Sequence, residues 1–565
     1  MRNRTLLDRM LAGAARVHAR RVLGRFLRAA DHATEVQQRI LLERVRANAS
    51  SDYGRDHGFS EIRTYQDFIR RVPVSTYETL APYVERVRQG HVGAMFGSGQ
   101  RVLMFAMTSG TTDQPKYVPV TDRFLADYRR GWNAFGVKVL MDHPSAFLRP
   151  IVQVTSPMDE QLAPSGVPCG AITGLMACTQ KRIVRKYYVT PPCVAYIPDA
   201  RARYYTIMRL AMAGDVGFMI TANPATQLRL ARIGDTFAEQ IVRDVSDGTL
   251  SGELDVPARV REQLAPRLKP NPARADQLRH IRETTGRLLP KDVWNLGFVA
   301  NWTGGTVGLY LQDFPEFFGD TPVRDIGLLA SEGRMSIPIE DTTPAGILEV
   351  TSNFYEFIPA EEHDADTPTV LRSHEVEVGR EYFILLTTSA GFYRYDVGDQ
   401  VRVVGFHGQA PVIEFLHKGL HVSSLTGEKL TEQQAVRAFD RACRTLGLTA
   451  DTFVIAPQWA AVPFYRLHVA RGAVGAPEAA GRLATEVDRQ LRAANIEYAC
   501  KQDSGRLGPL SVNLLPDGFL GELEARLAAR RGRQEQYKHR YLCPRPGDDA
   551  DFPIASPAPA PQPTR

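Results

Sequence analysis

Mainly apolar runs alternate with amphipathic stretches through the first part of the chain. The runs at 102–107, 151–156 and 216–223 predict buried strands, because a strand that is covered on both faces lacks a regular polar alternation. Apolar residues recur at intervals of three and four in 201–214 and 225–245, which predicts helices between and after these strands. The alternation indicates an α/β fold, with a large N-terminal domain built on mainly parallel sheets.

The pattern changes after residue 345. Segments rich in β-branched and aromatic residues, separated by turn residues, occupy 346–359, 381–406 and 410–416. Such segments predict an antiparallel meander, which we interpret as a small β-barrel-like region within the large domain.

Helix and strand patterns return after His417-Lys418-Gly419. We therefore expect a large domain over residues 1–417 and a small, mobile α+β domain over 420–543. Residues 544–565 are rich in proline and alanine and hold few large apolar side chains, which predicts a disordered tail.

The net charge of +6 is concentrated at the N-terminus. Residues 1–50 hold eleven arginines against four acids, a net charge of +7, which leaves −1 for the remainder. The body therefore has no broad basic surface for nucleic acid. Apolar residues at helical spacing between Leu6 and Leu27 predict basic amphipathic helices. A mitochondrial transit peptide is the alternative, which the lack of any serine before Ser50 disfavours.

The chain has no stretch of about 18 uncharged apolar residues, so we expect no membrane span. The six cysteines show no C-x-x-C spacing, and no histidine pair completes a zinc set. We interpret them as reduced thiols of a cytoplasmic protein, and we expect a monomer without nucleic-acid or membrane partners.

One apolar run ends in the small residues Thr108-Ser109-Gly110-Thr111-Thr112, and Lys116 follows four residues later. Backbone N–H groups and hydroxyls in such a loop form a nest for an anion, and a lysine adds a point charge. The sequence therefore predicts a phosphate-binding loop; a solvated turn before a helix is the alternative. It is not a Walker A loop, because Tyr117 follows the lysine.

Three later stretches fit the same kind of ligand. Gly304-Gly305 permits a flat ligand to approach the backbone, with a plain loop as the alternative. Glu332, after Ser331, ends an apolar run where a carboxylate ligand of Mg²⁺ is expected, with a surface glutamate as the alternative. Asp399 follows Gly398 in what we interpret as a tight turn between two strands, where it can accept both ribose hydroxyls; a plain hairpin turn is the alternative.

These motifs, in this order, resemble the auxin-responsive acyl-acid amido synthetase family (Gretchen Hagen type) of the adenylate-forming superfamily. The matching stretches include TSGTTDQPKYVPVT, GLLASEGRMSIP, FYRYDVGDQVRVVGFHGQAPVIEFLHKG and SSLTGEKLTE. The resemblance extends from about Ala33 to Lys538. It breaks at Asp113, where the family often has glycine, and at Leu328, where it usually has a tyrosine that stacks on adenine.

The resemblance implies an ATP-dependent, Mg²⁺-dependent ligase that makes an acyl-AMP and pyrophosphate from a carboxylic acid and then transfers the acyl group to an amine or amino acid. The implied nucleotide-binding residues are Thr108, Ser109, Gly110, Thr111, Thr112, Gly304, Gly305, Ser331, Asp399 and the hinge residue Lys418. Glu332 would bind the metal. The implied catalytic lysines are Lys538, Lys429 and Lys116. A thioester ligase acting on acyl-CoA or a carrier protein is the alternative, and a non-catalytic nucleotide-binding protein is a second.

Overall fold

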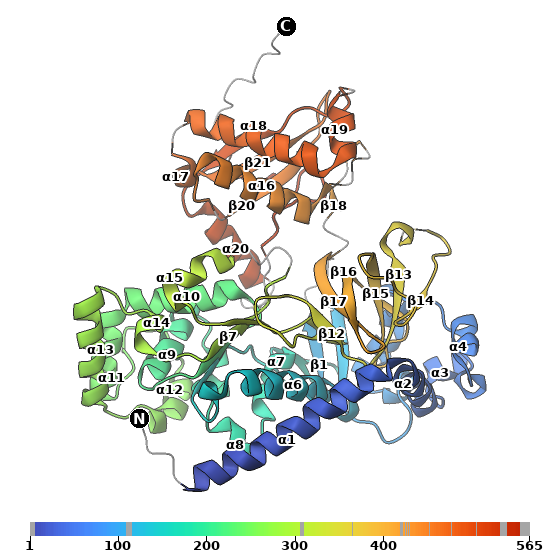
Figure 1. The fold of residues 1–565 in the computed structure, drawn as a ribbon, viewed down its shortest axis with the longest axis horizontal. Coiled ribbons are helices and arrows are strands. Elements are labelled where there is room, and N and C mark those ends of the chain that lie inside the picture. Colours follow the sequence, from blue (N-terminus) through green and yellow to red (C-terminus); the bar gives the residue numbers. More distant parts are fainter. Residues whose placement is uncertain are drawn as a thin grey trace. The chain divides into compact units, whose positions relative to one another are not determined.

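The computed structural model shown in Figure 1 divides into two compact units, residues 1–415 and 416–565. The expected domain boundary, near His417–Gly419, falls a few residues after this division. None of the described helices is long and apolar enough to cross a membrane. The structure describes residues 6–108, 116–304, 310–363, 365–418, 422–423, 425–426, 428, 430–450, 452–475, 477–503, 505–530 and 539–553.

The predicted N-terminal helices are confirmed as α1 (Leu6–Asp31) and α2 (Ala33–Ala47). The apolar face of α2 is buried in the core of the first unit. Within that face Gln37 is also buried, and it donates through Nε2 to the carbonyl of Asn353 at 2.7 Å and accepts from the N–H of Tyr355 at 2.9 Å. These bonds satisfy the buried amide and fix α2 against the later strands.

A parallel sheet with the order β3-β6-β7-β8 lies at the centre of one part of the first unit. Its strands are β3 (Ile151–Gln153), β6 (Phe218–Ile220), β7 (Phe298–Asn301) and β8 (Val323–Asp325). Every neighbouring pair is parallel, which confirms the parallel arrangement expected of the α/β pattern. The carboxyl ends of the strands therefore share one edge, where open α/β sheets bind ligands.

The helices expected after these strands are α9 (Ala200–Met212), α10 (Pro224–Thr236) and α11 (Ala238–Asp247). Their apolar side chains share one buried cluster with strand residues such as Met219 and Val299. The single helix expected over 225–245 is interrupted at Phe237, which ends α10 and precedes α11.

A second sheet, with the order β2-β1-β5-β4, is mixed. Its central strand β1 (Val102–Thr108) pairs antiparallel with β2 (Lys116–Thr121) and parallel with β5 (Pro168–Gly170). The edge strand is β4 (Gln161–Leu162). Helix α6 (Asp122–Asp142) begins directly after β2, and Thr121 caps it by accepting the N–H of Phe124 at 3.1 Å.

The predicted meander is a seven-stranded sheet in the order β11-β12-β17-β16-β15-β13-β14. The strands are β11 (Ser336–Ile337), β12 (Gly346–Leu348), β13 (Phe354–Pro359), β14 (Leu371–Arg372), β15 (Glu381–Thr387), β16 (Tyr395–His407) and β17 (Ala410–Lys418).

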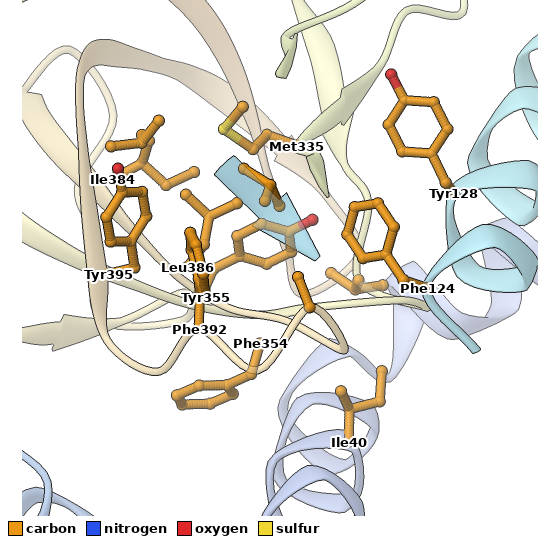
Figure 2. Close-up of a cluster of buried hydrophobic side chains, with 14 of the residues drawn as sticks. Ile40, Phe124, Tyr128, Met335, Phe354, Tyr355, Ile384, Leu386, Phe392 and Tyr395 are labelled. Atoms are coloured by element: carbon orange, nitrogen blue, oxygen red, sulfur yellow. The ribbon is translucent and has the colours of Figure 1, made fainter. Parts of the chain in front are cut away.

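The barrel-like closure that we expected of this region is wrong. The two edge strands, β11 and β14, stand at opposite ends of the sheet and hold only two residues each, too few to join into a closed ladder. The sheet instead packs against other elements. Figure 2 shows Ile40 of α2 and Tyr128 of α6 in one buried cluster with Tyr355 and Leu386 of the sheet.

A buried ion pair holds the segment that leads into β16. Nε of Arg394 lies 3.1 Å from both carboxylate oxygens of Glu356, and the two side chains are 7% and 1% exposed. Nη1 of Arg394 also donates to the carbonyl of Val72 at 2.9 Å, and its N–H donates to Oγ1 of Thr387 at 2.9 Å. These contacts sustain a left-handed backbone at Arg394, with a φ of 46°.

The second unit contains a three-stranded sheet in the order β20-β21-β22. Its strands are β20 (Phe453–Gln458), β21 (Phe464–Ala470) and β22 (Ser511–Leu515), and its longer helices are α16 (Glu432–Leu446), α18 (Pro477–Ala494) and α20 (Phe519–Arg530). The helix and strand patterns expected after residue 419 are thus confirmed.

The segment after α20 extends this sheet. The N–H of Ile455 donates to the carbonyl of Tyr541 at 2.7 Å, and the N–H of Cys543 donates to the carbonyl of Ile455 at 2.8 Å. Residues 541–543 therefore run alongside β20, in parallel.

The expectation of a disordered tail from residue 544 is wrong for residues 544–553. Nε2 of His468, which is fully buried, lies 2.8 Å from Oδ2 of Asp549, and Gln458 donates to the same oxygen at 2.8 Å. Phe552 joins the apolar cluster behind the sheet. Composition does not indicate these contacts, because only a few residues of this Pro- and Ala-rich stretch make them. Residues 554–565 lie outside the described part of the chain.

The Arg394–Glu356 pair is expected to be essential for the stability of the first unit. Arg394→Met should lower the free energy of unfolding by about 3–5 kcal/mol, because it leaves a buried carboxylate without its counter-charge. The double variant R394M/E356Q should recover part of that loss, because no isolated charge remains. Chemical denaturation measures both.

The control is Arg372→Met. Arg372 forms an ion pair with Glu375 near the surface, and the two side chains are 37% and 35% exposed. Its loss should change stability by about 1 kcal/mol or less. Equal losses in the Arg372 and Arg394 variants would contradict a special role for the buried pair.

Truncation after Cys543 is expected to lower the melting temperature of the second unit by several degrees, because it leaves His468 buried without its carboxylate partner. Truncation after Pro553 is the control and should leave the melting temperature unchanged. Differential scanning calorimetry of the two truncated chains distinguishes the outcomes. Identical melting curves for both would restore the interpretation of a disordered tail from residue 544.

Candidate functional site

The predicted phosphate loop connects β1 to β2. Thr108 pairs with Lys116 across the antiparallel ladder, and the residues between them, which include Ser109, Gly110, Thr111 and Thr112, lie outside the described part of the chain. Helix α6 begins only after β2, so the loop joins two strands and does not precede a helix directly.

Lys116 is held beside an aromatic ring. Its Nζ lies 5.4 Å from the centre of the Tyr77 ring, a favourable position for a cation. The hydroxyl of Tyr77 accepts the N–H of Tyr117 at 2.7 Å, which ties the first residues of β2 to α5 (Tyr77–Arg88). The strand that carries Lys116 is therefore held in place at its first residues.

A buried carboxylate joins the carboxyl ends of β7 and β8. Oδ2 of Asp325 accepts the N–H and the hydroxyl of Thr303 at 2.6 and 2.7 Å, and Oδ1 accepts the N–H of Gly327 at 2.6 Å. Burial raises the pKa of Asp325, and these hydrogen bonds oppose the rise. Our sequence interpretation missed this residue, which stands directly before the apolar stretch 326–330.

Gly304 directly follows Thr303 at this edge. A Cβ added to it would stand 2.9 Å from Cβ of Pro344 and 3.3 Å from the carbonyl oxygen of Phe415. The close packing of the chain is thus one reason for a glycine here. Its contact with a nucleotide remains a prediction, and Gly305 lies outside the described residues.

Ser331-Glu332 forms the tip of a tight hairpin between β9 (Leu329–Ala330) and β10 (Gly333–Arg334). The Glu332 side chain is turned inward, because the residue is only 6% exposed. The alternative of a surface glutamate is therefore wrong. Burial raises the pKa of Tyr395, and the nearby charge of Glu332 raises it further, so the carboxylate lies close to that phenol.

This carboxylate fits a nucleotide-bound Mg²⁺, which usually takes one or two protein carboxylates and completes its shell with phosphate oxygens and water. No group of three or more His, Cys, Asp or Glu side chains among the described residues is arranged to hold a metal by itself. A single buried glutamate that supplies one carboxylate is the arrangement expected for such a shared ion.

The tight turn that we predicted at Gly398-Asp399 is wrong, because both residues lie inside the continuous strand β16. The pairing between β15 and β16 shifts between Phe383 and Leu385, so the strand bulges here, with Gly398 at a φ of 71°. Glycine and aspartate occur often in both turns and bulges, so the composition alone could not distinguish a turn from a bulge. Asp399 is 6% exposed, and its contact with a ribose remains a prediction.

The remaining candidates belong to the end of β17 and to the second unit. Lys418 is the last residue of β17, and its side chain, like Lys429 and Lys538, lies outside the described part. Glu428, directly before Lys429, is 1% exposed and accepts the N–H groups of Leu425 and Thr426 at 2.6 and 2.8 Å. Burial pushes the pKa of Glu428 up, but these bonds hold it below its usual value.

One of the candidate residues, Glu332, acts on Tyr395 in the first unit. The charges of Glu332, Glu78 and Tyr77 all act on its hydroxyl. Lys116 in turn contributes to a lowered pKa at Glu78, after that carboxylate's hydrogen bonds. Glu332 and Glu78, which are far apart in sequence, thus both raise the pKa of Tyr395. Tyr395 and Tyr77 were not among the sequence candidates, although Tyr395 stands in the quoted YRYD stretch.

The fold is that of the acyl-acid amido synthetases. The solved structure of the GH3.15 acyl acid amido synthetase superposes with a TM-score of 0.81 at 18% identity, covering 93% of this chain and 94% of that chain. Another solved structure, of AtGH3.15 in complex with 2,4-DB, gives the same TM-score and covers 94% and 95%.

Family models identify the chain more closely. The GH3 family N-terminal domain matches residues 22–323, the central domain matches 346–418 and the C-terminal domain matches 433–546. The chain therefore belongs to the GH3 family.

Curated relatives agree with this assignment. The chain is similar to the jasmonoyl–L-amino acid synthetase JAR4 of Nicotiana attenuata, at 24% identity over 73% of this chain and 74% of that protein. It is also similar to the indole-3-acetic acid-amido synthetases GH3.10 of Arabidopsis thaliana (23%, covering 92% and 94%) and GH3.8 of Oryza sativa subsp. indica (25%, covering 89% and 87%). The protein is thus an enzyme, a ligase of the acyl-acid amido synthetase class.

Proposed function

We propose that the protein uses MgATP to adenylate a small carboxylic acid and then joins the acyl group to an amine or amino acid. The buried carboxylate of Glu332, at the tip of a tight hairpin and beside Tyr395, is the observation that carries this proposal. A carboxylate that the fold keeps out of water at this tip suits the metal that accompanies a nucleotide.

In the first step, an oxygen of the acid attacks the α-phosphorus of ATP, and pyrophosphate leaves. Negative charge grows on the phosphate oxygens, so a fixed cation near them lowers the barrier. Lys116, set on β2 beside Tyr77, supplies one such charge, and the bound metal would supply a second through Glu332. Asp399 would accept the ribose hydroxyls and orient the nucleotide.

In the second step, the amine nitrogen attacks the acyl carbon, AMP leaves, and the nitrogen loses a proton. No side-chain nucleophile is required, because the substrates supply both nucleophiles. Lys538, with Lys429 as the second choice, would present charge to the α-phosphate from the second unit.

The chemical class of both substrates is proposed from the relatives. Their names pair jasmonate or indole-3-acetate with an amino acid or an amido group, so they favour an amide over a thioester product. None of the five described cysteines forms a disulfide, which supports our proposal that the enzyme works in the cytoplasm. We also propose that it acts as a monomer.

Glu332→Gln is expected to lower acid-dependent pyrophosphate release by about 100-fold or more, because the amide keeps the shape of the side chain and removes the charge that would bind the metal. The measurement is pyrophosphate release over a panel of carboxylic acids, with mass spectrometry of the product. Glu340→Gln is the matched control, because Glu340 is a nearby exposed residue of the same type. Wild-type release by the Glu332 variant would refute its role at the metal.

Lys538→Ala is expected to slow adenylation by about 100-fold, the scale on which one pre-positioned charge donor acts, while ATP affinity changes little. ATP–pyrophosphate exchange measures the first step, and calorimetry measures nucleotide binding. Normal exchange in this variant would transfer the role to Lys429. Products of ADP and phosphate, instead of AMP and pyrophosphate, would exclude adenylation.

A further inference from the structure

A pocket of about 210 Å³ lies outside the carboxyl ends of two parallel strands in the first unit. One is β3, which ends at the lining residue Gln153 and is followed by the lining residue Thr155. The other is the segment 187–189, which pairs with β3: the N–H of Ile151 donates to the carbonyl of Tyr187 at 2.8 Å, and that of Val189 donates to the carbonyl of Ile151 at 2.9 Å. Pockets at this position bind ligands in open α/β sheets.

The side chains around the pocket favour a polar ligand with negative charge. Gln153, Gln180 and Thr190 supply neutral hydrogen-bonding groups, and Arg185 and Arg267 supply two cations. No carboxylate is among the lining residues. Within the described part of the chain, Oγ1 of Thr190 is buried and has no hydrogen-bond partner, so a ligand that reaches it would satisfy this group.

The charge around the rim of the pocket also favours a negatively charged ligand. Helix α8 (Arg182–Arg185) is flanked by Lys181 and Lys186, and all four cations of this segment are exposed. None of them forms an ion pair with a carboxylate in the part of the chain that the structure describes. Arg287, by contrast, contacts two carboxylates. A group of unpaired cations at the mouth of a polar pocket raises the local concentration of anions.

The pocket also lies on the reactive edge of the parallel sheet. The carboxyl ends of β3 and β7 face the same way, and one strand, β6, separates them. Two strand spacings of about 4.8 Å put the end of β3 about 10 Å from the end of β7, which Gly304 follows closely in sequence. A small molecule that reacts at the second position can therefore place its far end at the first.

We propose that this pocket binds an anionic group, a carboxylate or a phosphate, at the far end of one of the two organic substrates. The proposal rests on the proposed function for the reaction at the other end of that substrate. In this proposal, Arg185 and Arg267 select a substrate that carries a second negative charge.

Matched substrate pairs in two arms test this. In the acid arm, glutarate and valerate, which have the same chain length, are compared by ATP–pyrophosphate exchange without amine. In the amine arm, glutamate and glutamine are compared by amide formation. In one arm the wild type should show a KM about tenfold lower for the substrate with the extra charge, as expected of hydrogen bonds to a charged group. The preference should weaken as ionic strength rises.

Arg185→Gln should abolish most of that preference while kcat and the KM of the neutral substrate stay within about twofold. Arg267→Gln should do the same, although Arg267 also donates to the carbonyls of Tyr188 and Val189 at 3.2 Å, so its melting temperature is checked. Lys291→Gln removes one charge from an exposed site elsewhere in the unit and should change nothing. No charge preference in either arm, or equal effects of the Arg185 and Lys291 variants, would overturn the proposal.

A binding measurement separates this proposal from the proposed function. Calorimetry of glutarate with the wild type and with Arg185→Gln needs no turnover. If no acid releases pyrophosphate but glutarate binds about tenfold more weakly to the variant, the reaction is wrong and the anion pocket stands. If turnover is normal and calorimetry shows that the two proteins bind glutarate equally and glutamate equally, the pocket is wrong and the reaction stands.

Discussion

The buried ion pair between Arg394 and Glu356 is the interaction on which the candidate site most depends. It joins three segments that are distant in sequence: the carbonyl of Val72, the middle of β13 and the residue directly before β16. Two charges that are almost completely removed from water must compensate each other closely, so the geometry tolerates little movement. Because Tyr395 is the next residue, the ion pair also fixes the backbone that carries this phenol, whose pKa the charge of Glu332 raises after burial.

The same principle applies at the edge of the parallel sheet. Asp325 remains buried because three donors from two strand ends surround it, and its loss would separate those ends. Glu332 is buried on the tip of a two-residue hairpin, where the backbone leaves it little freedom. Groups that are fixed before a substrate arrives stabilise developing charge without the cost of reorganisation. The contacts that keep Asp325 and Glu332 buried are therefore also contacts that would hold charged groups in place for a substrate.

Much of the fold and the site followed from the sequence, and the errors have common causes. Long apolar runs and helical spacing identified β1, β6 and α9, because burial on a fixed period determines which residues are apolar. The bulge at Gly398 and the interruption at Phe237 were not visible, since the local composition suits either conformation. The anchored segment around Asp549 was missed because its partner, His468, is distant in sequence. Only the folded chain reveals that kind of pairing, which also explains why Asp325 was not recognised as a support for Gly304.

The candidate lysines adjoin residues that buried polar contacts hold in place. Lys429 follows Glu428, whose carboxylate accepts two backbone N–H groups. Lys538 precedes His539, which contacts Glu524 at 2.6 Å through Nδ1 and the carbonyl of Phe453 at 2.8 Å through Nε2. A long, flexible lysine side chain loses much conformational freedom when it binds a phosphate, and an anchored neighbour reduces the backbone part of that loss. Glu428 and His539 are therefore fixed neighbours in sequence for the two candidate lysines.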